Sequence, residues 1–281
     1  MRKTILIIVA IVVIAVAGFF IWISMPPAPT TAVLYVESGV VEVDLGKGWQ
    51  SAVDEMELDE NSKVRTMDGE ASVVLLAGEV VHLEPNTEIS LDEVSDDKIS
   101  IKQLAGETWN KVSGISGVAV YEVGTPTTVA TVRGTEFFVK IGELDEVGVL
   151  EGVVDLAPLT DRTKIHKIKA MRKAFMDKLG EVREEELGPE DIERAKRFKE
   201  KYIANLKATR LHEILKHKTL LKMAKTRYGV DEAKIKQFLE DVDAGKENED
   251  ELYEQIPGFL KKRAELPYKI TKFIKKAQAQ S

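Results

Sequence analysis

The most constraining feature of this sequence is an uncharged run from Thr4 to Ser24, in which most residues are apolar. A helix needs about 20 apolar residues to cross the hydrocarbon layer of a membrane, so this run is long enough to span one. Inside lipid a chain must satisfy its backbone hydrogen bonds internally, which favours a helix despite the many β-branched residues. The sequence therefore predicts a transmembrane anchor over residues 4–24.

The charges on either side of the run predict the orientation of the anchor. Arg2 and Lys3 precede it, and the next basic residue is Lys47. The positive-inside rule then places residues 1–3 in the cytoplasm and everything beyond the anchor outside it.

A cleaved signal peptide is the alternative interpretation, with cleavage near Ala28 or Ala32. The apolar core of a signal peptide is shorter, about 7–15 residues, which favours an uncleaved anchor. The proline-rich residues 25–31 predict a short, stiff spacer after the anchor.

Charge divides the remaining chain into two parts. Residues 1–159 hold 10 Lys and Arg against 25 Asp and Glu, a net charge of −15, whereas residues 160–281 hold 30 against 22, a net charge of +8. Such asymmetry indicates two modules with different surroundings. The chain has no cysteine, which excludes disulfides, thiolate metal sites and cysteine nucleophiles.

Residues 32–158 carry the short alternating apolar runs that are typical of strands. Examples are residues 33–36, 71–76 and 118–123, which are rich in valine and separated from their neighbours by Gly, Asp, Asn and Pro. Runs of this kind at a spacing of about 8–12 residues predict an all-β domain, either a sandwich, a roll or a short solenoid.

Motifs within this β region resemble those of a FecR domain. The residues that carry the resemblance are Trp49, Arg65, Thr66, Gly106, Trp109, Thr125, Pro126, Arg133, Gly134, Thr135, Phe137 and Gly152. The stretch Val-Arg-Gly-Thr-Glu-Phe at residues 132–137 is the strongest mark of the family. One departure is Asn61-Ser62, where the family commonly has Gly-Asp. Asparagine also tolerates left-handed backbone geometry, so the turn is expected to survive.

The resemblance implies a function as well as a fold. The resemblance implies a signalling protein. Its extracytoplasmic part would sense an outer-membrane iron-siderophore transporter, and its cytoplasmic part would control a sigma factor. Only residues 1–3 precede the predicted anchor, so we expect no sigma-factor-binding domain there. We expect a non-catalytic binding or scaffold role in the cell envelope, with a transmembrane signalling role as the alternative. A glycan-acting enzyme that uses paired carboxylates is a more distant alternative.

We expect the motif residues to act mainly in the structure. Gly134 and Gly152 suit turns or bulges, and Arg133 is expected to pair with a nearby carboxylate. Trp49 and Trp109 are expected to pack in the core or at a sheet edge. The alternative is that the Arg133 turn contacts a ligand and that the two tryptophans form a recognition surface.

We expect no catalytic, cofactor or metal site. His82 lies on an alternating apolar run and is expected to be an ordinary strand residue. His212 and His217 are five residues apart, whereas the zinc-binding helix motif places its histidines four apart on one helix face. Neither a nucleophile elbow nor a phosphate-binding glycine loop occurs in the sequence, and nucleic acid is not an expected partner outside the cytoplasm.

The basic segment, residues 159–281, predicts a helical domain. A first helix over residues 164–182 is predicted from an apolar stripe at spacings of three and four, formed by Ile165, Ile168, Met171, Phe175 and Leu179. The excess of Lys and Arg suggests an anionic partner, such as lipid headgroups, an acidic envelope polymer or the acidic β domain. The plainer interpretation is the solvated face of a helical bundle.

Further helix boundaries follow from local signals. Residues 188–191, Gly-Pro-Glu-Asp, open a second helix, because proline suits the first turn and acidic residues favour the N-terminal dipole. Gly229 predicts a helix end and Asp231 an N-cap. Pro257 and Pro267 are expected to bracket short final helices.

Overall fold

The computed structural model describes residues 32–115, 117–218, 221–222, 225–226, 230–256 and 258–279. The predicted anchor at 4–24 and spacer at 25–31 lie outside these residues, as do Gly229 and Pro257. Within the described part, no helix combines the length and apolarity that a membrane crossing requires. The described residues divide into a β unit, residues 32–210 with 273–279, and a helical unit within residues 211–272.

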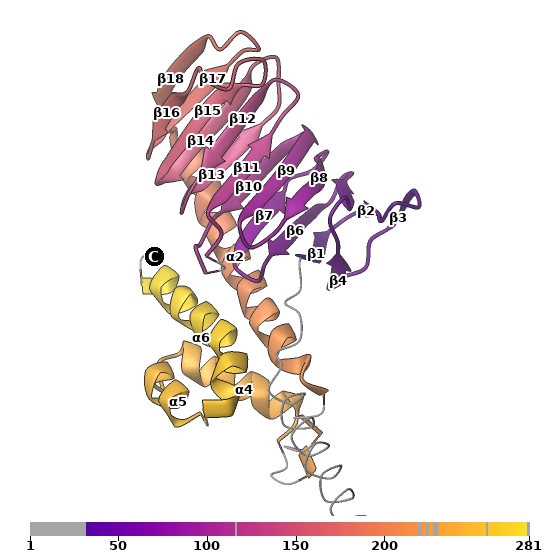
Figure 1. The fold of residues 1–281 in the computed structure, drawn as a ribbon, viewed down its shortest axis with the longest axis vertical. Coiled ribbons are helices and arrows are strands. Elements are labelled where there is room, and N and C mark those ends of the chain that lie inside the picture. Colours follow the sequence, from indigo (N-terminus) through magenta and orange to yellow (C-terminus); the bar gives the residue numbers. More distant parts are fainter. Residues whose placement is uncertain are drawn as a thin grey trace, which may run out of the picture. The chain divides into compact units, whose positions relative to one another are not determined.

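The strands of the β unit form two sheets of nine described strands each (Figure 1). The first sheet contains β1 (Ala32–Ser38), β4 (Met56–Leu58), β6 (Glu70–Leu75), β7 (Glu79–Leu83), β10 (Glu107–Lys111), β13 (Glu136–Lys140), β14 (Asp145–Glu151), β17 (Arg172–Met176) and β18 (Val182–Glu186). The second sheet contains β2 (Val41–Asp44), β3 (Trp49–Ser51), β5 (Lys63–Thr66), β8 (Glu88–Val94), β9 (Lys98–Ala105), β11 (Val120–Gly124), β12 (Thr128–Val132), β15 (Val153–Pro158) and β16 (His166–Lys169).

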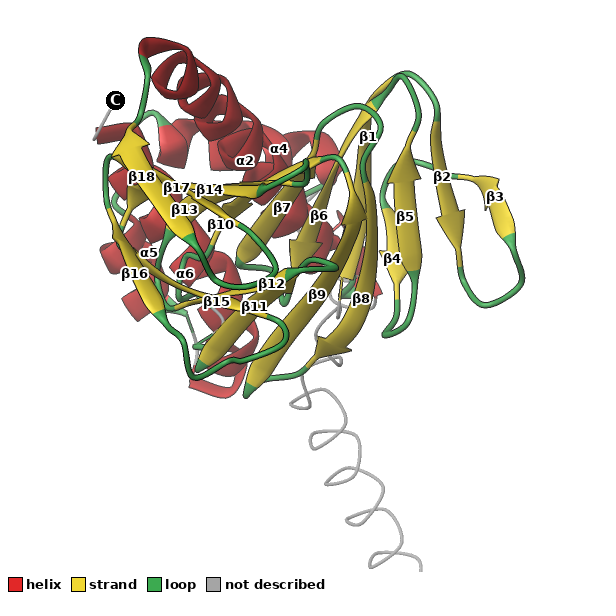
Figure 2. Cartoon of the chain, turned by 90° about the horizontal axis from the view of Figure 1, so that it is seen from above, coloured by secondary structure: helices red, strands yellow, loops and turns green. Residues whose placement is uncertain are grey.

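The two sheets lie face to face, and the chain passes repeatedly from one to the other (Figure 2). The first sheet has the order β18-β17-β14-β13-β10-β7-β6-β1-β4, and the second has the order β16-β15-β12-β11-β9-β8-β5-β2-β3. Hairpin partners such as β6 and β7 are antiparallel, whereas β9 and β11 run parallel. The predicted all-β domain is confirmed, and its architecture is a sandwich.

Alternating side chains from both sheets fill the space between them. On β2, for example, Val41 and Val43 are buried while Glu42 lies at the partly exposed face, as a period of two residues requires. The core also contains polar bridges between the sheets; in one of them the Tyr121 hydroxyl of β11 donates to Asn110 Oδ1 of β10 at 2.8 Å. This bond satisfies both buried groups, which would otherwise be costly to remove from water.

The helix predicted over residues 164–182 is wrong, because this segment forms β16, β17 and the start of β18. The apolar stripe that suggested a helix is largely on the surface: Ile165, Met171 and Leu179 are 55, 49 and 64% exposed. Instead, β17 pairs with β14, and β16 pairs with β15. The strands therefore continue beyond the domain boundary expected after residue 158.

Two tight turns explain why strands form in this segment. Met171, between β16 and β17, has φ of 66°, and Gly180, between β17 and β18, has φ of 84°. Left-handed residues interrupt a helix but suit tight turns. The turn at Met171 carries the chain from the second sheet to the first, and the turn at Gly180 closes the β17–β18 hairpin. Strands β17 and β16 also provide ladder partners for the edges of β14 and β15, which would otherwise carry unpaired backbone groups.

The C-terminal part is helical, with α2 (Pro189–Leu215), α4 (Glu232–Asp243), α5 (Glu249–Gln255) and α6 (Gly258–Ala279). The predicted start of the second helix at 188–191 is confirmed. The predicted cap at Asp231 is also confirmed, since its carboxylate accepts a hydrogen bond from the Lys234 amide at 3.1 Å.

The helix break predicted at Pro267 is wrong, because this residue lies inside α6. A proline within a helix removes one backbone hydrogen bond and costs about 3 kcal/mol. Tertiary packing offsets this cost: Tyr268 of α6 stacks on Tyr253 of α5 with ring centroids 4.3 Å apart.

Candidate functional site on the outer face of the first sheet

The first half of α2 covers the outer face of the first sheet. Its buried stripe consists of Ala195, Phe198, Tyr202 and Leu206, each at most 6% exposed. Spacings of three and four place these side chains on one face of a helix. This face packs on strands β1, β6, β7 and β10, so residues that project outward from those strands contact α2.

Trp109, one of the motif residues, lies beneath this helix. Its side chain is 0% exposed, and its ring centroid is 4.9 Å from that of Phe138 and 5.9 Å from that of Phe198. The indole Nε1 donates to Glu107 Oε1 at 3.0 Å. Trp109 therefore has a packing role and is not part of an open recognition surface.

An arginine of α2 completes this contact. The Arg194 guanidinium pairs with Glu107 and, at 3.4 Å, with Glu84, and it also lies 5.2 Å from the Trp109 ring centroid. Burial raises the pKa of the Glu107 carboxyl above its ordinary value, although the charge of Arg194 and its hydrogen bond act in the opposite direction. A buried carboxylate of this kind needs its cation, because an unpaired charge in the interior is costly.

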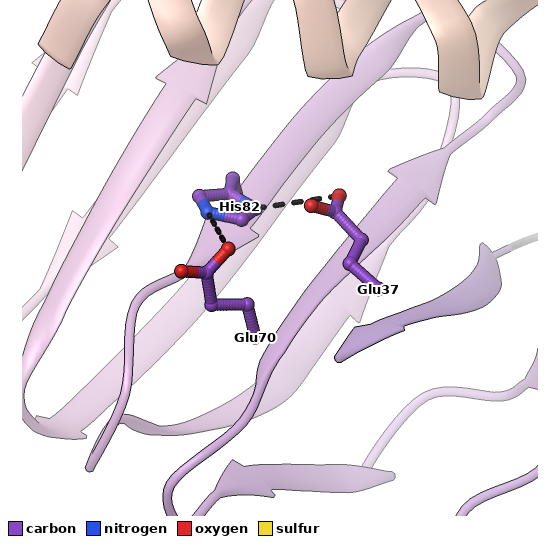
Figure 3. Close-up of side chains that lie close together, drawn as sticks. All are labelled: Glu37, Glu70 and His82. Atoms are coloured by element: carbon purple, nitrogen blue, oxygen red, sulfur yellow. Dashed lines mark ion pairs between the residues drawn. The ribbon is translucent and has the colours of Figure 1, made fainter. Parts of the chain in front are cut away.

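Glu37, Glu70 and His82 form a second polar cluster on the same face (Figure 3). They come from the three neighbouring strands β1, β6 and β7, and both carboxylates point toward the imidazole. His82 Nδ1 lies 3.5 Å from Glu37 Oε1, and His82 Nε2 lies 3.8 Å from Glu70 Oε2. His82 is only 1% exposed.

Lys201 of α2 reaches into this cluster. Its ammonium contacts Glu70 Oε2, lies 3.0 Å from His82 Nε2 and lies 3.4 Å from Glu37 Oε2. Because the ammonium can only donate, His82 Nε2 is the acceptor and the ring proton resides on Nδ1. Nδ1 then donates to Ser72 Oγ at 3.1 Å, and the Ser72 hydroxyl donates to Glu37 Oε1 at 2.5 Å.

These hydrogen bonds change the acidity of Glu37. Burial alone raises the pKa of this carboxyl, but its interaction with the His82 imidazole and the hydrogen bonds from Ser72 and Asn205 outweigh burial and lower the pKa from 4.5 to about 2. Glu37 is therefore a carboxylate throughout the physiological pH range. Of this cluster, sequence reasoning singled out His82 alone and expected an ordinary strand residue, because the members are far apart in the chain.

Trp49, Arg65 and Thr66 lie in the second sheet and its adjoining loops. The Arg65 guanidinium lies 4.1 Å from the Trp49 ring centroid and pairs with Glu42 at 2.5 Å. The Thr66 hydroxyl donates to the Glu84 carbonyl at 2.7 Å and accepts from the Thr87 amide at 3.0 Å. These contacts connect neighbouring strands and loops, and the two tryptophans do not meet.

Two motif glycines occur where backbones approach closely. Gly106 has φ of 77°, and a Cβ there would overlap Thr87. Gly152 has φ of 89°, and a Cβ there would lie 2.9 Å from Thr135 Oγ1. Both positions therefore require glycine for backbone conformation as well as for space. Asn61, at the position where the family commonly has glycine, has φ of 67°, so its turn keeps the left-handed geometry.

Thr125 and Pro126 form the turn between β11 and β12. The hydroxyls of Thr125, Thr127 and Thr128 all donate to Asp145 Oδ2 of β14, the last at 2.8 Å. Asp145 is 2% exposed, so three hydroxyl groups replace the water that this carboxylate loses on folding. The turn of the second sheet is thereby joined to a strand of the first.

The stretch at residues 132–137 combines buried and exposed positions. Thr135 and Phe137 are both 0% exposed, and Phe137 meets Tyr121 edge-on with centroids 6.2 Å apart. Arg133 is exposed and has no ion pair among the described residues, so the carboxylate pairing expected for it is wrong. Gly134 has φ of 63° and open space around it, so Arg133 stands on an uncrowded turn.

Comparison with known proteins identifies the β region. Residues 58–155 match the family model described as FecR protein. Two crystal structures of a candidate anti-sigma factor from Parabacteroides distasonis ATCC 8503, at 2.50 and 1.65 Å resolution, are similar over part of the chain. Each is 22% identical, with TM-scores of 0.39 and 0.40, and the match covers 46% of this chain and 60 and 62% of theirs. No curated protein matches the sequence. Residues 58–155 of this chain are therefore a FecR domain.

Proposed function

We propose that this chain is a single-pass membrane-anchored protein whose FecR domain binds an acidic partner protein outside the cytoplasm without catalysing a reaction. The uncharged run at residues 4–24 supports the anchor, and the FecR match at residues 58–155 supports a regulatory binding role. In such a role the bound partner passes a signal on, and the chain itself supplies recognition.

The exposed side chain of Arg133 is the observation that carries this proposal. Within the described motif stretch, Thr135 and Phe137 are committed to the core, whereas Arg133 has neither burial nor an ion pair there. A guanidinium presents several donors in a fixed plane and suits a bidentate contact with a carboxylate.

The binding role is tested by cross-linking the full-length protein in cells at native expression. Wild-type chain and a Lys102→Glu variant are expected to capture the same partner, because Lys102 is an exposed charge elsewhere on the sandwich. Arg133→Glu is expected to reduce capture by about tenfold or more, equivalent to about 1.4 kcal/mol of binding energy. Equal capture by Arg133→Glu and wild type would contradict the proposed surface, and no protein captured by wild type would contradict the binding role.

The membrane placement has a separate test. Because the chain has no cysteine, Ser281→Cys provides one thiol for a membrane-impermeant maleimide. We expect labelling in cells whose cytoplasmic membrane is intact, with the outer membrane permeabilised where one is present. Labelling only after lysis would place the C-terminal part in the cytoplasm and overturn the proposed topology.

A further inference from the structure

The Lys201 ammonium occupies the centre of a three-donor site. His82 Nε2, Glu37 Oε2 and Glu70 Oε2 surround its Nζ, the first two at 3.0 and 3.4 Å. The three donors are carried by adjacent strands of one sheet, whereas Lys201 comes from α2. Strands hold ligand side chains more rigidly than loops do. The sheet therefore positions the three donor side chains, whereas the cation between them is supplied by α2.

The orientation of His82 is that of a metal ligand. Its Nε2 lone pair faces the centre of the site, while the Nδ1 proton is held by Ser72, whose hydroxyl in turn is held by Glu37. A histidine that binds a metal generally donates its other ring N–H to a nearby acceptor, which fixes the tautomer and the ring orientation. One imidazole with two carboxylates is a ligand set that suits zinc and similar ions.

The charge of the cluster also favours a divalent ion. Glu37 and Glu70 contribute two negative charges, of which one lysine balances only one. Arg194 does not supply the difference directly, because Glu84 and Glu107 pair with it. Arg197 is exposed and lines the rim, where solvent screens it.

A small polar hollow gives access to the site. It has a volume of about 70 Å³ and is lined in part by Glu70, His82, Arg197 and Lys201. The hollow has room for water that would complete the coordination of an ion. Lys201 is 30% exposed at its side chain, so its flexible stem has a route out of the cluster toward solvent.

We propose that Glu37, Glu70 and His82 form a binding site for a divalent transition-metal ion of the zinc type, which Lys201 occupies in competition with the metal. Bonds from zinc to nitrogen or oxygen are about 2.0–2.2 Å, so the side chains must move inward by about 1 Å when the ion replaces the ammonium. Metal and Lys201 then exclude one another. Metal binding releases this contact between α2 and the sheet and leaves the apolar contacts of Phe198 and Tyr202 in place.

The test is a titration of the full-length protein with Co²⁺, in detergent and in a buffer that does not bind metals. Lys201→Met removes the competing charge and keeps the length of the side chain. It is expected to bind Co²⁺ about tenfold or more tightly than wild type, with visible absorption bands from nitrogen and oxygen ligation. The matched control is Lys196→Met on the same helix, whose side chain is 70% exposed and pairs with Glu193. It is expected to bind like wild type.

The donors are tested in the Lys201→Met background. Adding His82→Gln or Glu70→Gln is expected to abolish the gain in affinity and the absorption bands. The proposal is overturned if Lys201→Met binds Co²⁺ no more tightly than wild type, or if the gain persists in both double variants. Circular dichroism verifies folding, and Lys201→Gln replaces Lys201→Met with the same expectations if the methionine variant does not fold. Either negative outcome would make the cluster solely a salt-bridged contact of α2.

Discussion

The ring of Phe138 packs directly against the backbone of Gly148, its cross-strand partner in β14. Phe138 is 1% exposed, and its ring centroid lies 4.9 Å from that of Trp109. The ring therefore occupies the space that any side chain at position 148 would need. Cross-strand neighbours of this kind set how closely two strands and the layer above them pack.

Gly148→Ala is expected to destabilise the protein by about 1–3 kcal/mol, because overpacking a close-packed core displaces its neighbours. The added Cβ would overlap the Phe138 ring, which Trp109 prevents from moving away. Urea unfolding monitored by circular dichroism measures the change. Gly124→Ala is the control, since its nearest neighbour would be the Ile101 carbonyl oxygen at 3.9 Å. Equal stability of the two variants would show that the ring has room to move.

Glu37→Gln is expected to lower stability at pH 7 by about 2 kcal/mol, because charged groups form stronger hydrogen bonds than neutral ones. The pKa of Glu37 is about 2 in the folded protein, below the ordinary 4.5. Its contribution is therefore complete above pH 4.5 and is lost as the pH falls toward 2, since the unfolded chain takes up the proton first. Denaturant titrations from pH 7 to pH 3 should show the wild type and the variant converging. A difference in stability between wild type and Glu37→Gln that does not change with pH would contradict this origin. The control is Asp92→Asn, at an exposed position.

Asp145→Asn is expected to destabilise the sandwich by about 2 kcal/mol, because an amide replaces the carboxylate that three threonine hydroxyls share. Thermal unfolding is the measurement. Asp155→Asn, on the surface of the second sheet beside Lys167, is expected to change stability by less than about 1 kcal/mol. A smaller effect at Asp145 than at Asp155 would refute the role assigned to the threonine cluster.

Phe198→Ala is expected to lower stability by about 3–5 kcal/mol, the usual cost of truncating a buried aromatic side chain. Phe198 is 2% exposed and covers Trp109, so its loss should also hydrate the indole and shift tryptophan emission to longer wavelength. Phe238→Ala, at a side chain that is 45% exposed, should leave the emission unchanged. An unshifted spectrum for Phe198→Ala would mean that α2 does not shield Trp109 in solution.

Local patterns in the sequence predict much of this fold. Alternation such as Val41 and Val43 around Glu42 identifies strands, and proline followed by acidic residues identifies the start of α2. The same reasoning fails at residues 164–182, where an apolar spacing of three and four coincides with a turn between the two sheets and the β17–β18 hairpin. The spacing of apolar residues does not reveal that Met171 adopts φ of 66°. It also does not reveal that open sheet edges need partners.

The polar cluster was beyond prediction for a different reason. Glu37, His82 and Lys201 are separated by 45 and 119 residues in the chain, and their meeting depends on strand order and on where α2 packs. Arg133 is the converse case: sequence reasoning identified the residue but gave it a local partner, whereas the fold exposes it. Side-chain identity is readable from sequence, but proximity follows only from topology.

The edge strands β16 and β18, which follow the FecR match in the chain, are expected to limit aggregation. An open sheet edge is a template on which another chain can add a strand, which is how aggregation begins. The outer strands β16 and β18 carry Lys167, Lys169 and residues Glu184–Glu186, so two copies that approach with the same edge strand repel. A chain ended after Leu159 would expose β14 and β15 in their place, together with the aromatic surface around Trp109. The family motif alone is therefore expected to aggregate, because residues 166–210 cover these edges and Trp109.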